Sequence, residues 1–360
     1  MAIMRRTWTI AAVCVASLAL SACVSADRPD EDPGESGAKA DGSIVVGTWG
    51  GDFGAIQEKA VVPVVAKNAP ELSVVFDLQD AETRMTKMRA EESGTSSMDV
   101  VGLTGDRTAV LEDFLMELDM SKIPNAKYIK EPLRNDYCVP MITSVVGITY
   151  NVDKVKPAPT SYDVFWDEKN KGKIGFFYTD NWAPILYASA ALAEGGDPAD
   201  DWDAGWPLVE SLQSEMDPQV FTSNEQLGQA LQTGQIWMTI TQQSRGVQWG
   251  AAGGEKLATV VPEETGFRYV SCVAIPKNAQ NVDGAYEYLN AVLDPSAQKQ
   301  FSENMKYAPT VTNADLDPEL QDAVDTVEAE AAGRVTTEDY AYLAENYADW
   351  SQRFTQLLQR

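Results

Sequence analysis

The sequence predicts an α/β fold built from two lobes. Short apolar strands alternate with amphipathic helices from residue 44, and the same alternation starts again at residue 174. Two long extended runs, 139–150 and 267–275, look like connections between these regions. Strands that alternate with helices of this length are typical of parallel βαβ units, so two such sets favour two α/β lobes.

The first 22 residues have the layout of a secretory signal peptide. Arg5 and Arg6 give a basic start, residues 8–20 are mostly apolar, and small residues precede Cys23. The run Leu20-Ser21-Ala22-Cys23 resembles a bacterial lipobox, in which the cysteine becomes the first residue and is acylated, for example with palmitate. The apolar run is too short to span a bilayer as a helix. We expect export and a lipid anchor on Cys23; the alternative is an ordinary secretory signal with a chance cysteine.

Residues 23–42 are expected to form a flexible tether behind the lipidated cysteine. The segment 24–42 is rich in acidic residues, proline, glycine and alanine, and it contains no aromatic residue. Such a composition cannot bury enough apolar surface to order itself.

The first alternation contains three predicted strands, each followed by a predicted helix. The strands are 44–48, 73–76 and 99–104. The first helix begins near residue 55, the second spans about 82–92 and the third about 108–117. Met85 and Met88 lie on the inward face of the second helix.

The second alternation begins with a strand at 174–178 and a helix at 183–193, for which Thr179, Asp180 and Asn181 offer N-caps. Ser223 and Gln226 have the spacing of a capping box, and Gly234 is placed to end that helix. A buried strand is expected at 236–240, directly after it.

Composition excludes several classes of function. The chain has 360 residues and a formal charge of −26, which becomes −28 when the segment with Arg5 and Arg6 is removed. A strongly acidic surface repels nucleic acid, so we expect no nucleic-acid partner. There is no histidine, which excludes Ser-His-Asp and Cys-His catalysis and the usual zinc sites. The chain also has no GxGxxG or GxxxxGK[ST] motif, so we expect no metal, no cofactor and no enzyme activity.

A set of short motifs, in order and at matching spacing, resembles bacterial extracellular solute-binding proteins of ABC importers, and most closely their spermidine/putrescine-binding group. The matching pieces are 48–51, 99–101, 123–125, 147–151, 261–266, 273–281, 285–286, 289, 293–295 and 307–310. The resemblance covers the chain from about residue 44 to the C-terminus.

The resemblance implies a two-lobed clamshell of the type II periplasmic-binding-protein fold, with two hinge strands. Lobe 1 is then 43–147 plus 273–308, and lobe 2 is 148–272 plus 309–360. The implied partners are a small-molecule solute, an ABC permease and its ATPase, with the protein itself a monomer. Closure on the solute is a hinge motion driven by contacts that only the closed state makes.

Ligands of open parallel sheets bind beyond the carboxyl ends of the strands, so the loops that follow the strands, together with the second hinge strand, hold the candidate site. The candidate ligand-binding residues are Trp49, Gly50, Asp52, Phe53, Thr104, Asp106, Asn181, Trp182, Gln242, Arg245, Tyr269, Ser271 and Tyr307.

The charged candidates suggest the type of solute. Polyamine binders of this family carry a carboxylate two positions after the aromatic residue of the second hinge strand; here Tyr269 keeps the aromatic, but Ser271 takes the carboxylate position. Arg245, and less strongly Arg268, can hold a carboxylate through two parallel hydrogen bonds. We expect a small polar solute that bears a carboxylate, such as an amino-acid derivative. A polyamine is the runner-up, and a lipoprotein that only bridges other proteins is a third alternative.

Cys138 and Cys272 both fall on the proposed hinge strands. An exported protein meets an oxidising environment, which favours one disulfide between them; two separate buried thiols are the alternative. Free thiols would keep open a thiaminase-like enzyme with a cysteine nucleophile, although no histidine is present to activate it.

Overall fold

The computed structural model describes residues 42–177, 182–194, 197, 199, 201–252, 254, 256–324, 333–336 and 340–358. The predicted signal peptide, Cys23, residues 24–41 of the predicted tether and the predicted N-caps at 179–181 lie outside the described residues.

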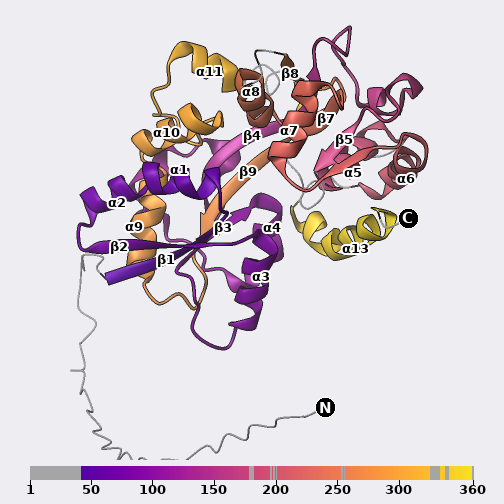
Figure 1. The fold of residues 1–360 in the computed structure, drawn as a ribbon. Helices are drawn as coiled ribbons and strands as arrows, with labels where there is room; N and C mark the ends of the chain where they lie inside the picture. The colour runs from indigo at the N-terminus through magenta and orange to yellow at the C-terminus, as the bar shows by residue number, and fades with distance from the viewer. Residues whose placement is uncertain are drawn as a thin grey trace, which may run out of the picture. The chain divides into compact units, whose positions relative to one another are not determined.

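The described chain alternates between strands and helices, as the sequence predicted (Figure 1). The strands are β1 Gly42–Thr48, β2 Leu72–Leu78, β3 Val100–Thr104, β4 Cys138–Asn151, β5 Gly175–Phe177, β6 Gln219–Phe221, β7 Met238–Gln242, β8 Leu257–Val260, β9 Gly266–Ala274 and β10 Val335–Thr336. The helices are α1 Asp52–Ala60, α2 Val62–Asn68, α3 Ala81–Ala90, α4 Gly105–Val110, α5 Trp182–Leu192, α6 Trp206–Glu215, α7 Asn224–Thr233, α8 Gln243–Ala252, α9 Val282–Val292, α10 Pro295–Met305, α11 Pro318–Val324 and α13 Tyr340–Leu358. Short 3₁₀ helices span Glu112–Phe114, Met120–Lys122, Pro124–Tyr128, Glu131–Leu133, Tyr162–Trp166, Glu168–Asn170 and Asp203–Gly205.

Eight strands form one sheet with the central order β2-β1-β3-β9-β4-β7; β8 also pairs with β4, and β10 with β9. β1 is parallel to both β2 and β3, which confirms the predicted βαβ units. β5 and β6 form a separate parallel pair. The fold is the predicted two-lobed α/β clamshell.

β4 and β9 are the two hinge strands. They pair antiparallel from Cys138 opposite Ala274 to Val146 opposite Phe267. All fourteen residues of β4 are buried. β4 therefore runs through the protein interior. β9, which is half-buried at Arg268 to Val270 and buried elsewhere, lies beside it between the two groups of helices (Figure 1).

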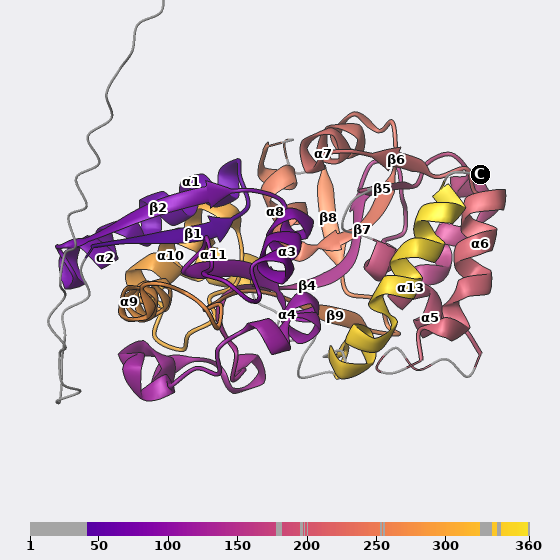
Figure 2. The ribbon, with the colours of Figure 1, turned by 90° about the horizontal axis from the view of Figure 1, so that it is seen from below.

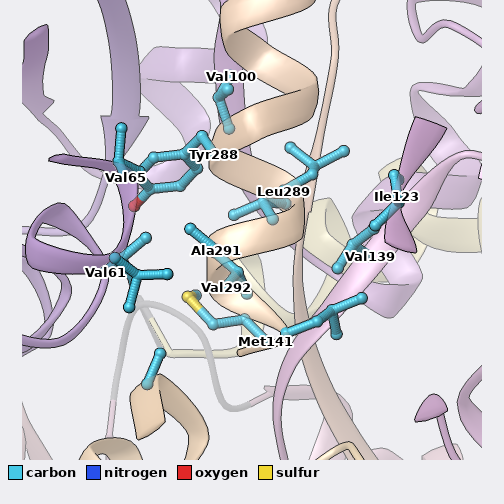
Figure 3. Packing of buried hydrophobic residues seen from close by; sticks show 14 of the residues in the cluster. Val61, Val65, Val100, Ile123, Val139, Met141, Tyr288, Leu289, Ala291 and Val292 are labelled. Carbon is cyan, nitrogen blue, oxygen red and sulfur yellow. The ribbon is translucent and has the colours of Figure 1, made fainter. Parts of the chain in front are cut away.

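Two large hydrophobic cores flank the hinge strands. The first core packs α2 and α9 against β3 and β4, and Figure 3 shows Val65, Val100, Met141 and Leu289 gathered in it. The second core lies among α5, α6, β7 and α13, and it includes Trp202, Trp206 and Trp350. A third, smaller core contains Met85 and Met88, which confirms the predicted inward face of α3.

The predicted bounds of three elements were wrong. α1 begins at Asp52 rather than near residue 55. α4 begins at Gly105 and ends at Val110, instead of spanning 108–117, because the following segment is drawn into extended pairing: Met116 N–H donates to the Ile275 carbonyl at 2.8 Å. β7 spans 238–242 rather than 236–240, because Ile236 N–H still bonds back to α7, at the Ala230 carbonyl.

The predicted cap of α7 is confirmed. Ser223 Oγ accepts a hydrogen bond from Gln226 N–H at 3.2 Å, and Gly234 adopts the left-handed conformation that ends the helix. Leu227 and Leu231 are fully buried beneath it. This geometry places the first turn of α7 beside the cavity described next.

Candidate functional site

A cavity of about 310 Å³ lies where residues from both lobes meet. β1 and β3 end at it: the loop after β1 supplies Trp49 and Gly50 to its wall, and the last residue of β3 supplies Thr104. β9 supplies Phe267, Arg268, Tyr269 and Val270, and α13 supplies Leu343 and Tyr347. The carboxyl ends of the parallel strands, where the sequence predicts the solute site, therefore lie at this cavity.

Several helices begin at this cavity and direct their N-terminal ends toward it. Lining residues come from the first turns of α1, α4, α5, α7 and α8: Asp52 and Phe53, Gly105 to Arg107, Ala183 and Pro184, Asn224 and Glu225, and Arg245. The N-terminus of a helix carries partial positive charge and unsatisfied N–H groups. Helix ends of this kind favour a negatively charged group, and three of them already carry an acidic residue in the first turn: Asp52, Asp106 and Glu225.

Among the described residues that line the cavity, three are arginines and none is a lysine. Arg245 Nη1 donates to Gln248 Oε1 at 2.9 Å. The neighbouring Tyr307 has the largest effect on Arg245 and raises the pKa of its guanidinium, while burial acts in the opposite direction. Arginine stays protonated in proteins at neutral pH, so Arg245 brings a positive charge to the cavity wall, where a carboxylate can reach it.

Arg107 is held by an ion pair and a hydrogen bond. Its side chain is 6% exposed, and Nη2 lies 3.0 Å from Glu82 Oε1. The same nitrogen donates to the Tyr347 hydroxyl at 3.1 Å. Two polar contacts thus fix this guanidinium in the cavity wall.

Aromatic rings form two faces of the cavity. Trp49 and Phe53 make an edge-to-face pair with centroids 5.1 Å apart, and Arg84 lies 4.3 Å from the centroid of the Trp49 ring. Tyr269 and Tyr307 are nearly parallel, with an interplanar angle of 25° and centroids 6.3 Å apart. Such faces suit the apolar portion of an organic solute or a cation.

Thr104 offers a polar atom that no described residue satisfies. Its Oγ1 is buried at the wall and has no hydrogen-bond partner within the described part of the chain. A buried hydroxyl without a partner is costly, so a donor or acceptor on a bound solute would stabilise it.

The structure brings most of the predicted ligand-binding residues together around the cavity. Those that line it are Trp49, Gly50, Asp52, Phe53, Thr104, Asp106, Gln242, Arg245, Tyr269 and Tyr307. Asn181 lies outside the described residues, and Trp182 begins α5 without a described side chain. Ser271 lies apart from the cavity: it is fully buried between β3 and β4, and its Oγ donates to the Leu103 carbonyl at 3.3 Å.

Several residues of the cavity wall were not predicted from the sequence. Glu225 follows the predicted N-cap Ser223, a signal that could have identified it as a residue of a cavity-facing first turn. Arg107 would have been found if the start of α4 had been placed at the strand end. Leu343 and Tyr347 carry no local signal, because the docking of α13 brings them here from far along the chain.

Cys138 and Cys272 are joined by a disulfide in the structure, with Cα atoms 5.8 Å apart. The bond links the two hinge strands, and the hydroxyl of Thr108 lies 3.3 Å from Cys272 Sγ. Both cysteines are buried. Sulfur atoms bonded in this way are not available as nucleophiles.

The described residues contain neither a metal-binding cluster nor a membrane-spanning helix. No group of three or more acidic or cysteine side chains is placed to hold a metal ion there. None of the helices in this part of the chain combines the length and apolar character needed to cross a membrane.

Comparison with known proteins gives consistent results. Residues 53–329 match the family model of the bacterial extracellular solute-binding proteins. The putrescine-binding periplasmic protein SpuD of Pseudomonas aeruginosa is 26% identical over 264 residues, which cover 66% of this chain and 71% of that protein.

Solved structures show the same fold. The structure of the Atu4243 GABA receptor superposes with a TM-score of 0.75 at 20% identity, covering 88% of this chain and 97% of that one. The spermidine/putrescine substrate-binding protein PotD of Streptococcus pneumoniae gives a TM-score of 0.69 at 21% identity, covering 88% and 99%.

The family match spans most of the chain, and the cavity between two hinged lobes is the structure that a solute-binding protein needs. Proteins of this family are exported, bind small solutes and deliver them to the permease and ATPase of an ABC transporter, and they are not enzymes. The chain belongs to the bacterial extracellular solute-binding protein family, with the type II periplasmic-binding-protein fold.

Proposed function

We propose that this protein captures a small polar organic solute that carries a carboxylate and an amine, such as an amino-acid derivative, for import through its ABC transporter. The observation that carries this proposal is Arg245, which stays charged at the cavity wall among converging helix N-termini. A guanidinium can bind a carboxylate through two parallel hydrogen bonds. The positive helix ends add to the same preference.

The amine of such a solute has its own partners. Asp52, Asp106 and Glu225 line the cavity, and the Trp49 and Tyr269 rings offer faces to a cation. The three carboxylates also lie in first turns of helices, where they stabilise the helix ends. They therefore do not by themselves require an amine, whereas the arginines have no such structural role at a helix N-terminus.

A polyamine is the second candidate, because the curated relatives bind putrescine and spermidine by name. Against it, the residue two positions after Tyr269 is Ser271, which carries no charge and does not line the cavity. The cavity also contains three arginines, which repel a polycation.

Calorimetric titration separates the two candidates. The wild type is titrated with 4-aminobutyrate and with putrescine, and the same titrations are made on Arg245→Ala. We expect 4-aminobutyrate to bind and the substitution to weaken it by about tenfold or more, since a hydrogen bond to a charged group is lost. Arg134→Ala is the matched control, because Arg134 pairs with Glu131 at the surface and does not line the cavity. Tight putrescine binding that Arg245→Ala leaves unchanged would reject the carboxylate solute.

We further propose that the mature protein is a monomer held to the membrane through lipid on Cys23. The support is the run Leu20-Ser21-Ala22-Cys23 behind a basic and apolar segment. We expect Cys23→Ala to release the protein into the soluble fraction while the wild type partitions with membranes. Identical fractionation of the two forms would reject the anchor.

The division into lobes 43–147 plus 273–308 and 148–272 plus 309–360 is also a proposal. The cores support most of it: the buried residues of the first core fall within 44–142 and 273–311, and those of the second within 146–240, 267 and 343–354. Two bounds differ, since Val311 packs in the first core and Val146 in the second.

A further inference from the structure

The helix α13 is anchored on the second core. Trp350 is 2% exposed, and its ring stacks on Trp202 with centroids 5.4 Å apart. Trp350 Nε1–H donates to Asp203 Oδ1 at 2.7 Å. Leu343 and Phe354 are buried in the same core. Figure 2 shows α13, in yellow, on the side of the molecule formed by α5 and α6.

The same helix also lies against α4, which belongs to the other lobe. There the Tyr347 hydroxyl donates to Glu82 Oε1 at 3.2 Å and accepts from Arg107 Nη2 at 3.1 Å. Glu82 and Arg107 also form an ion pair of 3.0 Å with each other. One phenol of the second lobe is therefore bonded to both members of an ion pair of the first lobe.

This contact is part of the cavity wall. Arg107, Leu343 and Tyr347 all line the cavity, and Trp202 beneath α13 lines it too. The contact between Tyr347 and Arg107 therefore closes one side of the cavity, at a place where the two lobes are joined by neither hinge strand.

We propose that Tyr347 is a positioning residue that fastens α13 across the cavity, holds the Arg107 guanidinium in the wall and slows the release of a bound solute. The proposal rests on the cavity being the solute site, but not on the identity of the solute. In an open form, α13 stays on the second core while Glu82 and Arg107 keep their own ion pair, so the bonds of Tyr347 to this pair are broken.

The hydroxyl of Tyr347 has the protonation state that this role requires. Burial raises the pKa of Tyr347 to about 12, so the hydroxyl remains protonated and able to donate at neutral pH. A contact made only in the closed state lowers the rate of opening and has little effect on encounter with the solute. Loss of the hydroxyl should therefore act mainly on the dissociation rate.

Tyr342 supplies a matched control on the same helix. Its hydroxyl accepts from the backbone N–H of Trp202 at 2.8 Å, and both groups belong to the second lobe. Tyr342→Phe thus removes a phenol hydrogen bond of α13 that does not cross the cavity, whereas Tyr347→Phe removes bonds that do.

The test compares the wild type, Tyr347→Phe, Tyr342→Phe and Glu82→Gln in the mature protein. Association and dissociation rates for 4-aminobutyrate and putrescine are measured by stopped flow, with the fluorescence of the cavity residues Trp49 and Trp202 as the signal. Amide hydrogen exchange of α4 is measured without added solute.

For Tyr347→Phe we expect a dissociation rate raised about five- to tenfold, an association rate changed less than twofold, and faster exchange in α4. Glu82→Gln should also raise the dissociation rate and the exchange of α4, by a smaller factor. Tyr342→Phe should leave the solute rates and α4 exchange unchanged.

Unchanged dissociation and exchange in Tyr347→Phe, or equal effects of Tyr342→Phe, would overturn the proposal. If neither solute binds the wild type, the proposed solute is wrong, and the exchange of α4 still decides the role of Tyr347.

Discussion

The two lobes are joined in two different ways. The hinge strands β4 and β9 are paired antiparallel by hydrogen bonds and linked by a disulfide; β4 is buried throughout, and β9 is buried except at Arg268 to Val270. The contact of α13 with α4 is instead partly exposed and polar: the Glu82 side chain is 59% exposed. The first connection cannot be broken without unfolding the protein, whereas water can readily replace the bonds of the second.

The difference indicates which connection can open and close. A binding protein of this family needs one joint that keeps the lobes aligned and one contact whose loss opens the cavity. Buried strand pairing meets the first need, and a few polar side chains at the cavity mouth meet the second. Substitutions in the hinge should therefore change stability, and substitutions in the α13 contact should change affinity.

Removal of the disulfide is expected to have the largest effect on stability. Cys138→Ala combined with Cys272→Ala should lower the free energy of unfolding by about 2–4 kcal/mol, because the unfolded chain is no longer cross-linked. Urea unfolding with and without reductant measures the effect, and reductant should destabilise only the wild type. Two free thiols in the denatured, unreduced mature protein would contradict the bridge.

A substitution at Gly147 tests the packing of the same joint. A Cβ at Gly147 in β4 would collide with the Val260 carbonyl oxygen, which belongs to the backbone of β8. Gly147→Ala should cost about 1–3 kcal/mol, because two paired strands must move apart. Gly94→Ala is the control, since the nearest atom to its Cβ, the Glu91 carbonyl oxygen, lies 3.8 Å away. Equal unfolding midpoints for the two variants would show that the strand pair yields easily.

Local sequence patterns predicted the hinge better than the α13 contact. Apolar runs and the polar residues after them identified both hinge strands and also Trp49, Asp52 and Thr104, since these features follow from the order of residues along one element. Tyr347 could not be found in this way, because its partners Glu82 and Arg107 lie more than two hundred positions earlier. The contact exists only after both lobes have folded and docked.

Ser271 illustrates the same limit within a strand. It lies two positions after Tyr269, so the alternation of a strand predicts that both side chains face the same side. At Ser271, however, β9 pairs with β3 as well as β4, opposite Thr104 and Ile142, and the side chain is covered. Sheet order, which no local pattern contains, decides whether that face is open to the cavity.

The smallest expected effect distinguishes the anchor of α13 from its contact with α4. Arg353 lies at the far end of α13, where Nη2 is 3.0 Å from Glu210 Oε1 and the guanidinium is 4.2 Å from the centroid of the Trp206 ring. Both members of the ion pair are about half exposed, so Arg353→Ala should cost only about 0.5–1 kcal/mol of stability. Neither member of this ion pair lines the cavity, and distant sites usually act independently. The rate of solute dissociation should therefore remain within about twofold of the wild-type rate. Urea unfolding and stopped-flow dissociation measure the two quantities on one preparation. A dissociation rate raised as much as in Tyr347→Phe would mean that any loosening of α13 releases the solute, and that the hydroxyl of Tyr347 has no special part in holding it.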